Sequence, residues 1–400
     1  MPASSASVRR RSPYAAVAGV GVGAALGWIG AASYFARRVL TPERARPDDT
    51  EVLAVAADEV TLAASVDTLA PGRYGLWFRG GHARIGEILA TDEGAGTVRR
   101  RLDGVAGGPL VPGGGRWTGS YYVAPTDETL GAAAVPVEVP GELGTLPAWR
   151  FDPTSPTGRW AVLVHGRGAT RDEPLRAVRV LLDLGITVLV PSYRNDPEAP
   201  PAPDGRYSLG LSEWRDVEAA MVYAVGAGAD SLVLGGWSMG GATVLQTLAR
   251  SWLADLVDAV VLDAPVVDWG DVLAHQARLH RVPPLLRDAS ALVMGRRSTR
   301  RLVGVHEPVD VAQTDWVSRA AELRHRMLIV HSRDDDFVPV GPSEQLAAVR
   351  PDLVRFEPWT IAGHCTEWNT EPARWERVVT EFLRETLGPR GGVSRAATDQ

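Results

Sequence analysis

The chain has 400 residues, more than a single hydrophobic core usually supports, so we expect more than one domain. Its hydrophobic fraction of 45% and charged fraction of 22% are ordinary for a folded protein. The net charge of -6, without a dense basic stripe, gives no reason to expect nucleic acid as a partner, and the lone Cys365 excludes an internal disulfide.

The N-terminal region, residues 1–50, predicts a membrane anchor. Three arginines, Arg9 to Arg11, precede a charge-free run whose apolar part, residues 15–36, is long enough to cross a bilayer as a helix. A cleaved signal peptide would have a shorter apolar stretch, so we expect an uncleaved single-pass transmembrane helix. Secretion after cleavage near Ala32 is the alternative, and arginines on both sides leave the orientation open.

Residues 51–148 have a different pattern. Short β-rich pieces, at residues 74–78, 120–123 and 135–139, lie between clusters of Gly and Pro. Such a pattern predicts a small β-rich domain with tight turns. Three roles stay open for this unit: it recognises substrate, it packs on a lid formed by residues 269–324, or it spaces the chain from the bilayer.

Residues 149–388 alternate apolar strands with helical patterns, which predicts an α/β domain with a mostly parallel sheet flanked by helices. The interval 269–324 interrupts this alternation, and we expect it to form a lid over the active edge of the sheet. We expect residues 389–400 to be a disordered tail. The predicted strands are residues 160–164, 186–190, 231–234, 259–262, 327–330 and 354–360.

The strongest motif is Gly236-Trp237-Ser238-Met239-Gly240, between an apolar strand and a helical pattern. A strand, a G-x-S-x-G turn and a helix in this order resemble the nucleophile elbow of the α/β-hydrolase fold. The turn is so tight that a Cβ two residues before or after the serine would clash, which accounts for Gly236 and Gly240. We therefore expect Ser238 to be a nucleophile.

The candidate base and acid follow Ser238 in the order that this fold uses. His364 lies in a Gly-containing loop after the last strand, and we expect it to take the proton from Ser238. Three consecutive aspartates precede it, and the D-x-x-V-P frame at residues 335–339 favours Asp335 as the orienting acid. Asp263, at the end of another strand, stays the alternative.

The first core strand is followed by the sequence His-Gly-Arg-Gly at residues 165–168. In the fold that the chain resembles, this loop lends one backbone N–H to the oxyanion hole. We therefore expect the N–H groups of Arg167 and Met239 to stabilise an oxyanion. The guanidinium of Arg167 either meets an anionic substrate group or points to solvent, and we expect His165 to brace the loop. The chemistry requires no metal and no organic cofactor.

Three further stretches resemble one part of the α/β-hydrolase superfamily, the serine aminopeptidase and prolyl-oligopeptidase-like branch, and in particular its membrane-anchored bacterial members. This resemblance implies a triad hydrolase and does not account for the β-rich unit. The stretches are Ser192–Asp196, Gly210–Asp216 and Gly363–Asn369.

Together these features predict a serine hydrolase that cleaves an ester, thioester or amide of a small-molecule or peptide substrate through an acyl-enzyme. A peptidase or acyltransferase of the same fold is one alternative. A catalytically silent, membrane-tethered binding module is the other. The sequence leaves the oligomeric state open.

Overall fold

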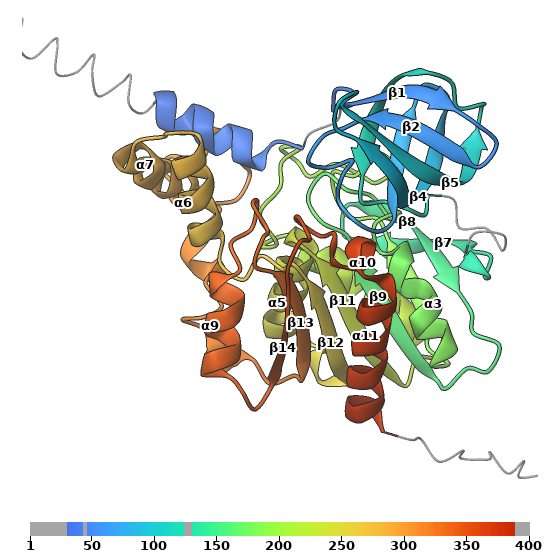
Figure 1. The fold of residues 1–400 in the computed structure, drawn as a ribbon. Coiled ribbons are helices and arrows are strands. Elements are labelled where there is room, and N and C mark those ends of the chain that lie inside the picture. Colours follow the sequence, from blue (N-terminus) through green and yellow to red (C-terminus); the bar gives the residue numbers. More distant parts are fainter. Residues whose placement is uncertain (1–29, 43–45, 124–129, 389–400) are drawn as a thin grey trace, which may run out of the picture.

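The computed structural model describes residues 30–42, 46–123 and 130–388, which form a small β-barrel above a larger α/β domain (Figure 1). The barrel closes in the strand order β1-β2-β5-β4-β3-β6, and its interior is filled by Val, Leu, Ile and Ala side chains. Its strands are β1 (Thr50–Val55), β2 (Glu59–Ala63), β3 (Tyr74–Phe78), β4 (Gly81–Asp92), β5 (Thr97–Gly107) and β6 (Gly113–Thr118).

The α/β domain is built on an eight-stranded sheet in the order β14-β13-β12-β11-β9-β10-β8-β7. The six strands from β9 to β14 run parallel, and β7 and β8 add an antiparallel edge. The strands are β7 (Val135–Gly141), β8 (Gly144–Phe151), β9 (Arg159–Val164), β10 (Thr187–Pro191), β11 (Ser231–Trp237), β12 (Val257–Asp263), β13 (Met327–Ser332) and β14 (Val354–Trp359).

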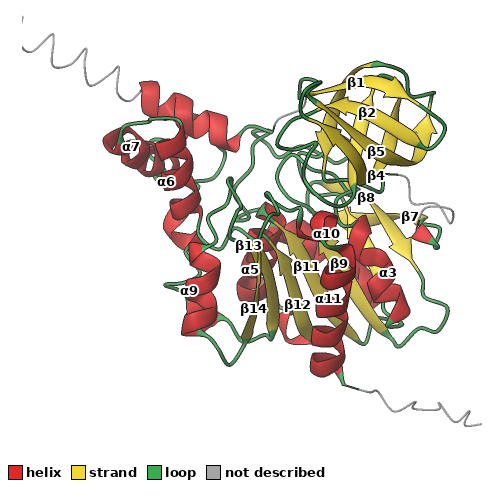
Figure 2. Ribbon diagram, in the orientation of Figure 1, coloured by secondary structure: helices red, strands yellow, loops and turns green. Residues whose placement is uncertain are grey.

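Helices cover both faces of this sheet, so the strands carry apolar side chains in both directions (Figure 2). In β9, for example, Val162 and Val164 pack toward one helical layer while Ala161 and Leu163 pack toward the other. One layer holds α3 (Leu175–Asp183) and α11 (Pro372–Leu387), and the other holds α4 (Trp214–Gly226), α5 (Met239–Arg250) and α9 (Gly341–Val349).

Between β12 and β13 the chain leaves the sheet and forms an insertion, which corresponds to the predicted lid. It contains α6 (Trp269–Leu279), α7 (Pro284–Gly295), α8 (Arg300–Val303) and the 3-10 turns η2 (Val311–Thr314) and η3 (Ala320–Glu322). The remaining short elements are η1 (Ala254–Leu256), before β12, and α10 (Glu367–Thr370), after β14.

The predicted β-rich unit of residues 51–148 is divided between two sheets, so its predicted C-terminal boundary is wrong. The barrel ends with β6 at Thr118, whereas β7 and β8 pair with each other and β8 pairs with β10 of the larger sheet. An alternating pattern indicates a strand with one exposed face but does not identify the sheet that the strand joins. Residues 120–123, predicted as β-rich, form no strand.

A helix at residues 30–40 packs against the insertion, beside α6 and α7 (Figure 1). Its buried side chains include Ala32, Ala36 and Leu40. Residues 30–36 of the predicted transmembrane span therefore belong to a helix with one face in the protein core. The rest of that span, residues 15–29, and the predicted tail at 389–400 lie outside the described residues. Within the described ranges, no helix combines the length and apolar character needed to cross a bilayer.

The barrel is fastened to the α/β domain next to α10. Arg100 is fully buried at the barrel wall, and its guanidinium donates to the carbonyl groups of Thr68, Ala70 and Gly72. These bonds fix the loop before Arg73, whose backbone N–H donates to the carbonyl of Asn369. A Cβ at Gly72 would lie 1.9 Å from that same carbonyl oxygen, so only glycine permits this approach.

Candidate active site

Ser238 stands at the junction of β11 and α5 with a strained backbone. Its φ of 50° and ψ of -118° lie in a region that side chains other than glycine rarely adopt. A Cβ at Gly240 would lie 2.2 Å from the carbonyl oxygen of Val164, and one at Gly236 would lie 2.7 Å from the backbone of Gly240. The two glycines therefore let β9, β11 and α5 approach closely enough to hold this turn.

His364 is brought to Ser238 from the loop after β14. Its Nε2 lies 2.8 Å from Ser238 Oγ, and its Nδ1 lies 2.7 Å from Asp335 Oδ2. Three side chains spread over the sequence thus form one continuous line of hydrogen bonds at the carboxyl edge of the parallel strands. A hydroxyl, an imidazole and a carboxylate in this order have the arrangement required for proton transfer away from the hydroxyl.

Among the candidate acids, the structure brings Asp335 to the imidazole. Its other oxygen, Oδ1, accepts from the backbone N–H groups of Phe337 and Val338 at 2.9 and 2.8 Å. Asp334 instead accepts from the N–H of Ile361. Asp263 accepts from Trp375 Nε1 in the core at 2.7 Å, where burial raises the pKa of this carboxyl.

The pKa shifts of the imidazole and the carboxylate follow from their proximity. Burial disfavours the charged imidazole, but the negative charge and hydrogen bond of Asp335 outweigh it and raise the pKa of His364 above 6.5. Burial would likewise raise the pKa of Asp335, yet the charge of His364 and hydrogen bonds from His364 and His331 lower it below 3.8. The pair therefore favours an ionised Asp335 and an imidazole that is readily protonated.

The two predicted oxyanion donors flank Ser238. Met239 is the first residue of α5, and Arg167 follows β9 in the neighbouring loop. Neither backbone N–H donates a hydrogen bond to another group in the described part of the chain. The loop itself is held by Glu173, whose Oε2 accepts from the N–H of Gly166 at 2.6 Å. Both N–H groups are thus available for an oxyanion, and that role stays a prediction.

The Arg167 side chain does not point freely into solvent. It donates to the carbonyl groups of Val39 and Thr41 at 3.2 and 3.0 Å, at the end of the helix at residues 30–40. Arginine suits this position because the last carbonyl groups of a helix have no partners within the helix. The N-terminal helix is therefore tied to the loop that carries the Arg167 N–H.

Two other groups of side chains fix the backbone around the site, and His165 has the bracing role expected of it. His165 is fully buried, stacks on Tyr193 and has its Nε2 2.8 Å from Asp196 Oδ2, so it braces the loop. Arg194 forms a buried two-point ion pair with Asp216 on α4.

The sequence did not point to a group of residues whose hydrogen bonds fix the loop that carries His364. Arg176, at the start of α3, donates to the Cys365 carbonyl at 2.7 Å and to Asn369 Oδ1 at 2.9 Å. Asn369 in turn donates from Nδ2 to the carbonyl groups of Arg73 and Gly119 in the barrel region. Arg176 lies in no recognisable motif, so the sequence offers no signal for it. Asn369 lies in the stretch Gly363–Asn369, which resembles the serine aminopeptidase and prolyl-oligopeptidase-like branch.

An apolar cavity of about 410 Å³ adjoins the line of hydrogen bonds. Phe337 lines it, and its ring centre is 5.2 Å from that of His364, while Arg167 lines the same cavity from the loop after β9. Its walls come from α6, α7 and the helix at residues 30–40. In residues 30–42, 46–123 and 130–388, no three His, Cys, Asp or Glu side chains are grouped as metal ligands.

Comparison with known proteins identifies the family. Residues 161–394, more than half of the chain, match the Alpha/beta hydrolase family. The chain belongs to the alpha/beta hydrolase family. It is therefore an α/β-fold hydrolase, and its residues 51–118, essentially the barrel, match a second family described as a domain of unknown function, DUF8805.

Two known proteins are similar to this hydrolase. The uncharacterized protein YqkD of Bacillus subtilis is 26% identical over 228 residues, which are 56% of this chain and 70% of YqkD. The structure of the esterase Pf2001 of Pyrococcus furiosus matches with a TM-score of 0.50 and 19% identity, over 66% of this chain and 94% of the esterase. At that identity the structural match shows a shared fold.

The ion pair predicts how the imidazole titrates. In wild type, the pKa of His364 should lie above 6.5, because the charge of Asp335 stabilises the protonated ring. Replacing Asp335 with Asn removes that charge and leaves burial as the main effect, so the pKa should fall below 6.5. A titration of the histidine ring signals by NMR measures both values.

The matched control is Asp334→Asn, which removes the same charge one residue away at a carboxylate that accepts from Ile361 instead. This variant should leave the pKa of His364 nearly unchanged. Equal pKa values in Asp335→Asn and wild type would contradict the coupling.

Proposed function

We propose that this chain is a serine hydrolase that cleaves carboxylic esters through an acyl-enzyme. The observation that carries the proposal is the unbroken line from Asp335 through His364 to Ser238, with contacts of 2.7 and 2.8 Å. The strained turn at Ser238 supports the same role, because such strain is usually retained at functional sites.

In the proposed mechanism, Ser238 Oγ attacks the ester carbonyl while His364 Nε2 accepts its proton. Asp335 holds the ring with Nδ1–H toward the carboxylate and stabilises the imidazolium that forms. The N–H groups of Arg167 and Met239 stabilise the tetrahedral oxyanion, and the protonated His364 gives its proton to the leaving alcohol. Water activated by the same imidazole then releases the acid and regenerates Ser238.

The apolar cavity supports an ester with an extended hydrocarbon acyl chain. Its volume of about 410 Å³ is typical of a small-molecule site, and aliphatic and aromatic side chains make up most of its lining. The described lining includes arginines but no Asp or Glu, so it offers no partner for the charged amine of an aminoacyl amide. This observation favours an esterase over the peptidase of the serine aminopeptidase branch.

The nucleophile is tested by Ser238→Ala. Loss of the hydroxyl should lower kcat for a p-nitrophenyl ester by roughly a million-fold, as in other triad enzymes. A fluorophosphonate probe should label wild type but not this variant. Ser318→Ala, which removes an exposed hydroxyl from the insertion, should be labelled like wild type.

A folded wild type that resists the probe would contradict the enzyme and favour the silent binding module. Near-normal turnover by a folded Ser238→Ala would exclude Ser238 as the nucleophile.

The apolar cavity predicts that activity depends on the length of the acyl chain of the ester. From acetyl to octanoyl esters, kcat/KM should rise by up to about fourfold per methylene, because each buried methylene contributes about 0.8 kcal/mol. Filling the cavity with Ala277→Phe should reduce activity on octanoyl esters while sparing acetyl esters. Measuring kcat/KM over an ester series, alongside aminoacyl p-nitroanilides, tests the cavity and the substrate class together.

The matched control for this series is Leu285→Phe, on α7, where the side chain is 74% exposed and does not line the cavity. It should keep the wild-type chain-length profile. A flat profile in wild type, or a preference for the anilides, would contradict an acyl esterase.

We also propose that the segment before the helix at residues 30–40 anchors the protein in a membrane. The charge-free run supports this, because residues 12–29 contain no charged side chain and have about the length that a helix needs to cross a bilayer. In fractionated cells, the full chain should stay in membranes after carbonate extraction, and a variant lacking residues 1–29 should be soluble. Release of the full chain by carbonate, or a mature N-terminus near Ala32, would favour the secreted alternative.

A further inference from the structure

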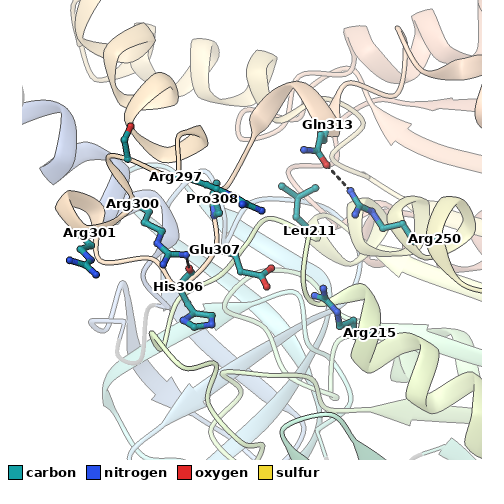
Figure 3. A pocket seen from close by; sticks show the side chains of 11 residues that line it. Leu211, Arg215, Arg250, Arg297, Arg300, Arg301, His306, Glu307, Pro308 and Gln313 are labelled. Atoms are coloured by element: carbon teal, nitrogen blue, oxygen red, sulfur yellow. Dashed lines mark hydrogen bonds between the residues drawn. The ribbon is translucent and has the colours of Figure 1, made fainter.

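A second hollow, of about 710 Å³, opens on another part of the insertion and is rich in arginine (Figure 3). None of its lining residues lines the apolar cavity. Arg250, at its edge, is the last residue of α5, so it lies about 18 Å along the helix from Ser238 at 1.5 Å per residue. The lining comprises Leu211, Arg215, Arg250, Arg297, Ser298, Arg300, Arg301, His306, Glu307, Pro308 and Gln313.

The charge of this hollow is unbalanced. Five of its lining side chains are arginines and one, Glu307, is a carboxylate, in a protein whose net charge is negative. In the described part of the chain, four of these arginines have no carboxylate oxygen within 4.0 Å. Among the described carboxylates, only that of Glu142 lies near the fifth arginine, Arg215, at 3.9 Å. The four are Arg250, Arg297, Arg300 and Arg301.

Neutral groups hold two of these cations in position. Arg250 donates to Gln246 Oε1 and Gln313 Oε1, both at 2.8 Å, and Arg300 donates to the His306 carbonyl at 2.8 Å. Figure 3 shows the bonds to Gln313 and His306. The cations also repel one another: burial, together with the charges of Arg319 and Arg215, lowers the pKa of Arg250. An anion in the hollow would relieve this repulsion.

We propose that the hollow binds the phosphate group of a phosphate-bearing anion. Guanidinium groups match phosphate oxygens in pairs of parallel hydrogen bonds, and several of them around one hollow provide the charge that a dianion needs. Arg215 and Arg250 come from the sheet-covering helices α4 and α5, whereas Arg297, Arg300 and Arg301 come from the insertion. A bound phosphate therefore links the insertion to the core. This site is independent of Ser238 chemistry.

Binding is measured on the full chain by isothermal titration calorimetry with sodium phosphate, at an ionic strength held constant with sodium chloride. The double variant Arg297→Gln, Arg301→Gln should bind phosphate at least about tenfold more weakly, because each charged hydrogen bond contributes more than a neutral one. Both side chains are exposed, so the variant should fold and keep its ester-hydrolysing activity on short esters.

Two further variants sharpen this measurement. Glu307→Gln removes the one carboxylate of the lining and should tighten phosphate binding several-fold. Arg377→Gln removes an equal positive charge from an exposed position on α11 and should leave the affinity unchanged. Equal phosphate affinities in wild type and the double variant would overturn the site. So would a loss of phosphate affinity in Arg377→Gln as large as that in the double variant.

Three probes distinguish the sources of the phosphate group: inorganic phosphate, glycerol 3-phosphate, and vesicles of phosphatidylglycerol compared with phosphatidylcholine. Binding of the two soluble probes, lost in the double variant, identifies a soluble ligand. Binding confined to phosphatidylglycerol vesicles, and equally lost in the double variant, identifies a lipid headgroup. Absence of binding to all three overturns the proposal.

Discussion

The backbone of Ser238 is the constraint on which the site depends. A residue with a side chain at this φ costs about 1–3 kcal/mol and persists only where its surroundings fix it. Here the Ser238 N–H donates to the Asp263 carbonyl, and the Ser238 carbonyl accepts from Val266, so the turn is bonded to the strand β12 and the residues that follow it. The imidazole and the carboxylate reach Ser238 from the loops that follow β14 and β13.

The loop that carries His364 is held by several distant parts of the chain. Arg176 connects it to α3, and Asn369 connects α3 to the barrel through Arg73. Cys365, next to the imidazole, has a positive φ of 54°, so this loop too is strained and needs support. The barrel therefore contributes to the site, because the loops next to β3 and β6 accept hydrogen bonds from Asn369 and so help to fix the backbone that positions the imidazole.

The parts of the site that could be predicted from the sequence are those with a local cause. Gly236 and Gly240 are required by clashes within a few residues of Ser238, and the D-x-x-V-P frame selected Asp335, whose Oδ1 accepts from Phe337 and Val338 in the same turn. Contacts between distant parts of the sequence leave no such mark. The bond of Arg167 to Val39, and the pairing of β8 with β10, depend on how distant segments meet in space.

The helix at residues 30–40 brings these long-range contacts together. Its end accepts from Arg167 in the loop after β9, while Arg37 on the same helix donates to the carbonyl groups of Leu302 and Val303 in α8. One short helix is thus bonded to the loop beside Ser238 and to the part of the insertion that carries Arg300 and Arg301. It also forms a wall of the apolar cavity. Because a few residues of this helix contact both the loop after β9 and the insertion, the position of one constrains the position of the other.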